Sequence, residues 1–89
     1  MSAGACAGCE VSWVLFENMH KDGGMSGGSQ VVIVDECLRV CSDYSSCKGI
    51  DWVPYESVGR RCWLHGSWSW ENMLTGYSGV HHYRIQRSK

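Results

Sequence analysis

The first apolar stretch of the chain, in residues 9–20, is apolar on both faces of a strand. Successive side chains of a strand point to opposite faces of its sheet. The apolar positions are Val11, Trp13 and Leu15 on one face and Val14 and Phe16 on the other. Apolar side chains on both faces are typical of a strand that is covered from both sides. We therefore expect this segment to be a central strand.

A second pattern predicts a short helix with two cysteines on one face. The preceding loop, KDGGMSGGS, is rich in glycine and is expected to be flexible. The next run, QVVIV, is either a strand or a covered lead-in to the helix. The helix is expected to begin at Asp35 or Glu36, because acidic residues suit the positive end of the helix dipole, and to run through DECLRVCSDY. Cys37 and Cys41 lie four residues apart and therefore share a face.

The remaining segments complete the expected secondary structure. CKGIDWVP is predicted to be a strand that ends at Pro54, and RCWLH is predicted to return antiparallel after a turn that contains Gly59. HGSWSWENMLTGYSG has too little periodicity for a strand, and GVHHYRIQ is predicted to be the last strand. The whole pattern predicts an α+β fold, in which an antiparallel sheet of four to five strands has one α-helix packed across it.

Length and cysteine content indicate a small domain from an oxidising compartment. The chain has 89 residues and a mass of 10.0 kDa, enough for one domain, which we place at residues 9–87 with tails at 1–8 and 88–89. A core of this size gives limited stability, and six cysteines indicate that disulfides supply the rest. We expect a secreted, extracellular protein, although no signal peptide is visible in the sequence. No apolar run is long enough to span a bilayer, so no membrane insertion is expected.

The charge distribution argues against nucleic acid as a partner. The formal net charge is −1 and the sequence pI is about 6.4, whereas nucleic-acid binding needs a concentrated basic surface. Arg60, Arg61 and the basic residues of the C-terminal segment are expected to be mainly solvated surface. The chain has five Trp and four Tyr but one Phe. Because Trp and Tyr combine an apolar ring with a polar group, they are enriched at recognition surfaces.

The cysteine spacing favours disulfides over zinc. The last four cysteines are separated by three, five and fourteen residues, whereas structural zinc sites usually contain paired CxxC turns. Only Cys6 and Cys9 have that spacing, no βαβ pattern surrounds them, and a single histidine such as His65 is more often packed than metal-binding. His81 and His82 are adjacent on a strand and point to opposite faces, so they cannot bind one metal together. We expect no metal and no cofactor. Spacing alone leaves many pairings of the six cysteines open.

The same residues resemble the PAN/apple domain family. The resemblance rests on Cys-x-x-x-Cys in the helix, Cys-x-Gly-Ile-x-Trp in one strand and Arg-Cys-Trp-Leu-His in the next. It extends upstream to WVLFEN and downstream to GVHHYRI, and so covers residues 9–87. The resemblance implies a disulfide-stapled α+β fold with the pairs Cys37–Cys62 and Cys41–Cys47.

The N-terminal cysteines depart from the family pattern. Apple-type members have a further disulfide from an N-terminal cysteine to one just after the last strand, but this chain has no cysteine after Cys62. We expect a Cys6–Cys9 disulfide, because a turn can bring the two α-carbons within the required distance of about 6 Å. The alternative is a disulfide between two chains. For the isolated domain we expect a monomer.

The resemblance also implies a binding module without catalytic activity. PAN/apple-like modules bind proteins or carbohydrates, and this chain shows no nucleophile-elbow or paired-carboxylate motif. We therefore expect no enzyme but an extracellular adhesion module that recognises another protein through an exposed surface of aromatic residues and arginines. One alternative is a lectin-like module that binds a carbohydrate by Trp stacking and polar contacts. Another is a small secreted signal or inhibitor.

The candidate binding surface centres on residues 65–77. Trp68 and Trp70 lie two positions apart and would form an apolar platform if the segment is extended; alternatively, one or both fold back over the sheet. Glu71 and Asn72 would add polar contacts to a glycan. The further candidates are Trp63 and His65, on the strand face opposite Cys62 and Leu64, and Tyr55, Arg60 and Arg61 at the preceding turn.

Overall fold

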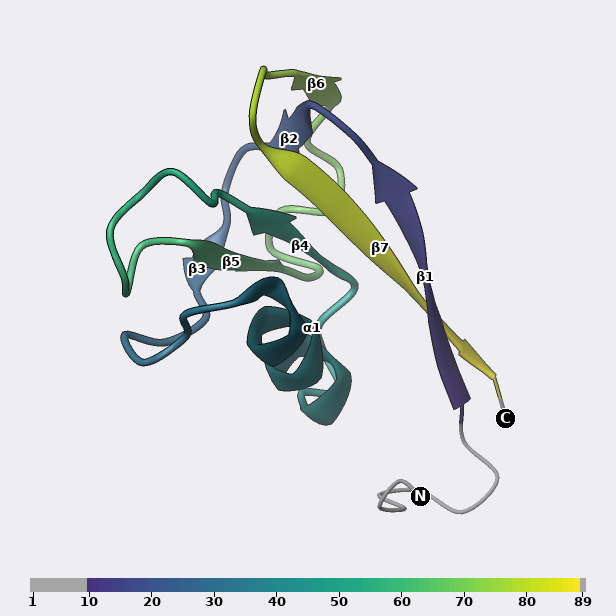
Figure 1. The fold of residues 1–89 in the computed structure, drawn as a ribbon. Coiled ribbons are helices and arrows are strands. Elements are labelled where there is room, and N and C mark those ends of the chain that lie inside the picture. Colours follow the sequence, from purple (N-terminus) through teal and green to yellow (C-terminus); the bar gives the residue numbers. More distant parts are fainter. Residues whose placement is uncertain (1–9, 89) are drawn as a thin grey trace.

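This computed structural model describes residues 10–88. They contain one helix and seven strands, joined by turns and loops. In chain order the elements are β1 (Glu10–Phe16), β2 (Met19–Lys21), β3 (Met25–Ser26), α1 (Val34–Asp43), β4 (Gly49–Trp52), β5 (Cys62–His65), β6 (Leu74–Gly76) and β7 (His81–Ser88). Five strands form an antiparallel sheet in the order β1-β7-β4-β5-β3, and β2 pairs with β6 in a separate ribbon (Figure 1). The chain therefore has the expected α+β class, with an antiparallel sheet and one helix across it.

Two disulfides link helix α1 to β5 and to the segment just before β4. Cys37 is bonded to Cys62 in β5, and Cys41 is bonded to Cys47 just before β4, with Cα–Cα distances of 5.5 and 5.3 Å. These are the two pairs that the resemblance implies. All four cysteines are buried, since each has an exposed fraction of 1 % or less. The core around them also contains Val31, Ile50, Trp52 and Leu64.

Side-chain hydrogen bonds fix both ends of α1. At the start, the Glu36 carboxylate accepts hydrogen bonds from the backbone N–H groups of Val32 at 2.7 Å and Ile33 at 3.3 Å. At the other end, the Arg87 guanidinium of β7 donates to the carbonyl oxygens of Cys41, Ser42, Tyr44 and Cys47. The last carbonyls of a helix lack partners within it and favour a positive charge. Arg87 is therefore more than solvated surface, because it holds β7 against the helix.

The opposite face of the sheet is polar at its centre. Ile50 and Trp52 belong to the core that contains the helix cysteines, so Asp51 between them points the other way. Strands β2 and β6 and residues 66–73 cover this second face: the backbone N–H of Lys21 in β2 donates to Asp51, and Ser69 contacts His65. The central strands thus have a helix on one side and an irregular polar cover on the other.

Strand β1 is an edge strand, which corrects the expectation of a central one. Among the described residues it pairs only with β7, and Val11 and Leu15 are exposed. The physical reason lies at the far end of the chain, because β7 pairs with both β1 and β4 and takes the interior position. The pattern of apolar residues in one segment indicates which side chains can be buried. It does not indicate which other strands pair with that segment.

The structure also tests the expectations for the three segments QVVIV, the glycine-rich loop and the connection after β5. QVVIV is a lead-in that enters α1, not a strand. The glycine-rich loop contains the short strand β3, which pairs with β5, and the connection after β5 contains β6. The expected Cys6–Cys9 pair lies outside the described residues. No helix in residues 10–88 has the length and apolar character needed to cross a membrane.

Candidate functional site

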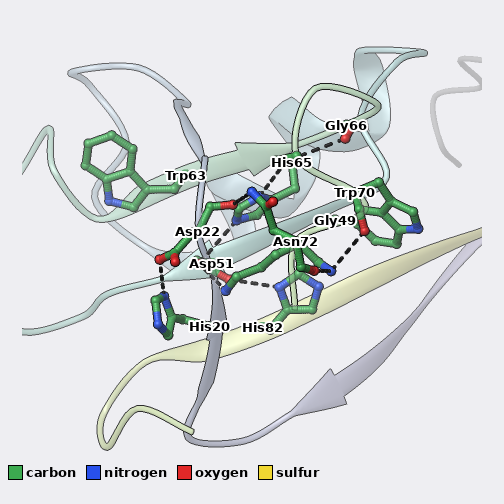
Figure 2. A network of polar contacts seen from close by, with 12 residues as sticks. His20, Asp22, Gly49, Asp51, Trp63, His65, Gly66, Trp70, Asn72 and His82 are labelled. Atoms are coloured by element: carbon green, nitrogen blue, oxygen red, sulfur yellow. Dashed lines mark hydrogen bonds and ion pairs between the residues drawn. The ribbon is translucent and has the colours of Figure 1, made fainter. Parts of the chain in front are cut away.

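Three titratable side chains from three neighbouring strands meet on the polar face (Figure 2). Asp51 of β4 lies directly opposite His82 of β7, and His65 comes from β5 on the other side. Nδ1 of His82 is 2.8 Å from Oδ1 of Asp51, and Nε2 of His65 is 3.2 Å from Oδ2. The first contact is a hydrogen bond; the second is close but is not aligned as one. One donor atom from each residue lies within 4.8 Å of the others, so these side chains could hold a metal ion.

The cover over the polar face is tied to this cluster by hydrogen bonds. Nδ1 of His65 contacts the Ser69 hydroxyl at 2.8 Å, and Oδ2 of Asp51 accepts the backbone N–H of Lys21 at 3.1 Å. The Lys21 ammonium is turned away and donates to the carbonyl oxygens of Trp70 and Asn72 at 3.2 and 2.7 Å. Buried polar groups need such partners, because an unpaired one costs free energy. The ribbon and residues 66–73 are therefore positioned by polar contacts.

Burial and mutual contact set the protonation of the cluster. Burial raises the pKa of Asp51, but the contacts with His65 and His82 and the Lys21 N–H outweigh it, so the pKa lies below the ordinary value. Burial also lowers the pKa of His82, and the neighbouring carboxylate only partly opposes this shift. At neutral pH the cluster therefore contains an ionised Asp51 and a neutral His82. Since the carboxylate can only accept, Nδ1 of His82 carries the proton of their hydrogen bond.

A pocket of about 270 Å³ opens beside the cluster, and Asp51 forms part of its lining. It lies between β2, the turn after β4, β5 and the segment after β6. The side chains that give it its chemistry are His20, Asp22, Tyr55, Glu56, Arg60, Trp63 and Tyr77. The pocket thus combines aromatic rings with three carboxylates, counting Asp51, and one guanidinium.

Local contacts hold the aromatic walls in place. The Trp63 indole N–H donates to the carbonyl oxygen of Arg60 at 2.9 Å, which fixes the ring against the preceding turn. The His20 ring meets the Tyr77 ring edge to face, with centroids 4.9 Å apart. Tyr55 is 58 % exposed at the rim, where the Arg60 guanidinium lies 3.9 Å from the Glu56 carboxylate. The pocket therefore has fixed rings inside and charged groups at its mouth.

The structure brings three of the sequence-predicted candidates together in this pocket, namely Tyr55, Arg60 and Trp63. His65 lies beneath them, fully buried, and is not part of the pocket lining. Arg61 is directed elsewhere: its guanidinium donates to the carbonyl oxygens of Glu56 and Val32 at 2.7 and 2.9 Å. Arg61 therefore ties the turn to the helix lead-in.

Trp68 and Trp70 do not share one platform. Residues 66–72 form successive turns, in which Gly66 accepts from the N–H of Ser69 and Ser69 accepts from that of Asn72, so period-two spacing does not apply. The Trp68 ring stacks on Tyr44, with centroids 6.4 Å apart, and remains 41 % exposed. Trp70 instead packs beside His82, at 6.1 Å, with Lys21 4.8 Å from its ring. Figure 2 shows Trp70 and Trp63 at opposite ends of the polar network.

The two polar candidates of that segment, Glu71 and Asn72, are both exposed. The Asn72 side-chain amide donates to the carbonyl oxygen of Asp22 at 2.8 Å, which links the segment to the loop after β2. Asn72 therefore borders the pocket indirectly, through Asp22.

Sequence reasoning missed six residues of the site: His20, Asp22, Asp51, Glu56, Tyr77 and His82. A partial signal existed for Asp51, because it alternates with Ile50 and Trp52 in a predicted strand and must point away from them. His82 was expected to point opposite to His81, and it is the fully buried one of the two. That these side chains meet depends on β7 lying beside β4, which no local pattern encodes.

Comparison with known proteins gives no assignment. No protein-family model, curated protein or solved structure matches this chain. Functional inference therefore depends on the motif residues and on the geometry of the pocket and the polar cluster.

Proposed function

We propose that the chain is a PAN/apple-like extracellular module that binds a carbohydrate, without catalysis, in the pocket beside Asp51. The observation that carries this proposal is the pairing of aromatic rings with carboxylates and a guanidinium around one small hollow. The two disulfides that attach the helix to the sheet suit an oxidising, secreted setting.

The aromatic side chains supply the apolar contact that a sugar ring needs. The C–H face of a pyranose packs against an aromatic ring in the way that other apolar groups do. Trp63 offers a ring whose orientation is already fixed by its hydrogen bond to Arg60, so little conformational entropy is lost when a ligand stacks on it. Tyr55 and Tyr77 add exposed rings that end in hydroxyl groups.

The charged side chains supply the polar contacts. Sugar hydroxyls donate to carboxylates and accept from guanidinium groups, and hydrogen bonds to ionised partners are stronger than neutral ones. Asp22, Glu56 and Arg60 place both kinds of partner at the pocket. A volume of about 270 Å³ lies just below the usual range for small-molecule pockets, so it suits one sugar residue.

Protein recognition is the second candidate, and a different surface favours it. Tyr44 and Trp68 stack on each other and are both exposed, beyond the C-terminal end of α1. Paired exposed aromatic residues are typical centres of protein interfaces. This surface does not involve the pocket residues, so the two functions can be separated by mutation.

A glycan array with the full chain, in buffer that contains EDTA, tests the proposal. Tyr55→Ala and Arg60→Ala are the informative variants, because both side chains are mainly exposed and their removal should leave folding intact. We expect each to weaken glycan binding at least about 10-fold, as the loss of one good contact does. Tyr44→Ala and Trp68→Ala are the matched controls and should bind as the unaltered chain does.

Two results would overturn carbohydrate binding in this pocket. One is an array on which the unaltered, correctly disulfide-bonded chain binds no glycan. The other is binding that persists in both pocket variants but is lost in Trp68→Ala, which would transfer recognition to the Tyr44–Trp68 surface.

A further inference from the structure

The Asp51–His65–His82 cluster contains nitrogen atoms that the fold does not use. Both histidines are fully buried, and Nε2 of each has no hydrogen-bond partner among the described residues. Buried polar atoms without partners are uncommon and costly in folded proteins. Nε2 of His65, which faces the buried Asp51 carboxylate, needs a physical explanation that packing of the sheet alone does not supply.

Nδ1 of His82 and Nε2 of His65 are the ring nitrogens that face the buried carboxylate. Nδ1 of His82 lies 2.8 Å from Oδ1 of Asp51, and an ion bound there would replace the proton of this hydrogen bond, which moves to Nε2 of the same ring. His65 presents Nε2, and its Nδ1 is held by the Ser69 hydroxyl at 2.8 Å. A partner at the second nitrogen commonly fixes the tautomer and the ring plane of a metal-binding histidine.

The spacing between Asp51 and His65 suits two ligands of one ion. Oδ2 of Asp51 lies 3.2 Å from Nε2 of His65 without the alignment of a hydrogen bond. Bonds from Zn²⁺ to nitrogen or oxygen are about 2.0–2.2 Å long, so two ligands of a tetrahedral ion lie roughly 3.3 Å apart. His82 contributes the third donor from the neighbouring strand, with donor atoms of the three residues within 4.8 Å of one another.

Within residues 10–88, no permanently charged side chain contacts the buried carboxylate. Oδ2 of Asp51 accepts a backbone N–H from Lys21, whose ammonium is directed to the carbonyl oxygens of Trp70 and Asn72. An ionised carboxylate is costly to bury without a positive partner. A bound dication would compensate this charge and take the unpartnered Nε2 of His65 as a ligand.

Gly24 leaves space at the free nitrogen of His65. A Cβ atom at Gly24 would lie 3.3 Å from Nε2 of His65. A side chain at this position would crowd that nitrogen. The pocket reaches Asp51, which gives an ion a route from solvent to the cluster.

We propose that Asp51, His65 and His82 form a binding site for a divalent transition-metal ion, with Zn²⁺ as the ion that this set of one carboxylate and two imidazoles suits best. The site is distinct from the glycan contacts at the pocket mouth and does not depend on them. The expectation that the chain binds no metal rests on the cysteine spacing and on histidines taken one strand at a time. It does not consider these three residues together.

Zinc titration of the full chain tests the site. The Cys6→Ser/Cys9→Ser variant is the proper background, because a CxxC pair can bind zinc by itself. Isothermal titration calorimetry of this variant, freed of metal and titrated with Zn²⁺ alone, should show one ion per chain. Co²⁺ in place of Zn²⁺ should give visible d–d absorption without the near-ultraviolet band of a cobalt–thiolate bond.

Two amide variants assign the ligands with little change elsewhere. His65→Asn keeps an amide group near the position of Nδ1, which contacts Ser69, and deletes Nε2. His82→Gln keeps an amide group near the position of Nε2 and deletes Nδ1, which faces Asp51. Each should weaken zinc binding at least about 100-fold, more than the usual effect of changing a residue behind a ligand. His20→Asn is the matched control, since His20 lies 3.8 Å from Asp22 at the pocket and should leave zinc affinity unchanged.

Imidazole ¹⁵N NMR of the chain with all its histidines covers the case in which an amide variant fails to fold. Zinc should shift the nitrogen resonances of His65 and His82 and leave those of His20 and His81 in place. No stoichiometric zinc binding in the Cys6→Ser/Cys9→Ser background would overturn the proposal. Shifts at His20 or His81 instead, or unchanged affinity in both amide variants, would overturn it equally. EDTA removes metal from the glycan array, so the array tests carbohydrate binding without a bound ion. The zinc titration contains no glycan. Each proposal can therefore fail without affecting the other.

Discussion

The two faces of the central strands are held to their covering layers by different chemistry. On the helix face, buried cysteines are bonded in pairs and surrounded by apolar side chains such as Ile50 and Leu64. On the opposite face, a buried carboxylate contacts His65 and His82 and accepts one backbone N–H. The first face gains stability from apolar burial and covalent constraint. The second depends on hydrogen bonds that must be satisfied one by one.

This difference separates the scaffold from the site. In residues 10–88, the helix face has no buried side-chain polar atom without a partner, so it needs no ligand to account for its composition. The polar face retains unpartnered nitrogens on His65 and His82 and borders the pocket. Proteins tolerate such costs mainly where function requires them. The helix face should therefore control global stability, and the polar face should control binding.

The largest effect should come from opening the long disulfide. Replacing Cys37 and Cys62 by Ala should lower the free energy of unfolding by about 3 kcal/mol, because the bond closes a separation of 25 residues in the unfolded chain. Replacing Cys41 and Cys47, which are 6 residues apart, should cost about 2 kcal/mol. Urea denaturation of both double variants measures these values. A larger loss from the shorter bond would contradict the assignment of Cys37–Cys62 as the main constraint.

The next effect should come from the polar face. Asp51→Asn removes the negative charge of the carboxylate that accepts hydrogen bonds from Nδ1–H of His82 and the backbone N–H of Lys21. It should lower the free energy of unfolding by about 2 kcal/mol. Asp22→Asn is the matched control, because its side chain is 86 % exposed and its change should stay within about 0.5 kcal/mol. The comparison is made by urea denaturation in metal-free buffer, which removes any contribution from a bound ion. Equal losses in the two variants would mean that the cluster adds nothing to folding.

The helix face was largely predictable from the sequence, and the polar face was not. Cys37 and Cys41 share a face through their four-residue spacing, which is a local property of any helix. Ile50 and Trp52 alternate with Asp51 in a strand that the β-rich composition and Pro54 delimit. Local periodicity was therefore enough to predict the helix, the strands β4 and β5, and the face of the sheet to which each side chain of these strands points.

The site required information that no local pattern contains. His82 meets Asp51 only because β7 pairs with β4 on one side and with β1 on the other. The same pairing makes β1 an edge strand, although its apolar residues fill both faces. In residues 66–72, successive turns replaced the extended conformation on which the shared platform of Trp68 and Trp70 depended. Only the turn candidates Tyr55 and Arg60, with Trp63 on the next strand, reached the pocket from sequence reasoning.

The two tryptophans of that segment give the third prediction. Trp70 packs between Lys21, Arg84 and the ring of His82, so Trp70→Ala should cost about 1.5 kcal/mol, less than for a fully buried ring. Trp68→Ala removes an exposed ring and should change stability by about 0.5 kcal/mol or less. Thermal melts of both variants make the comparison. Similar melting temperatures for the two would contradict the different burial of these rings.

The smallest effect concerns the start of the helix and is seen in acid. Backbone N–H groups of Val32 and Ile33 donate to the Glu36 carboxylate and hold its pKa below the ordinary value. A carboxyl whose pKa is lowered by folding stabilises the protein above its unfolded pKa, about 4.3, and loses that contribution as the pH falls through the folded pKa. The melting temperature of the unaltered chain should therefore exceed that of Glu36→Gln at pH 7, and the difference should shrink steadily below about pH 4. Asp35→Asn, which removes a charge from the same helical turn without touching these hydrogen bonds, controls for the helix dipole. A difference between the unaltered chain and Glu36→Gln that is the same at pH 7 and pH 2.5 would show that the carboxylate charge does not stabilise the helix start.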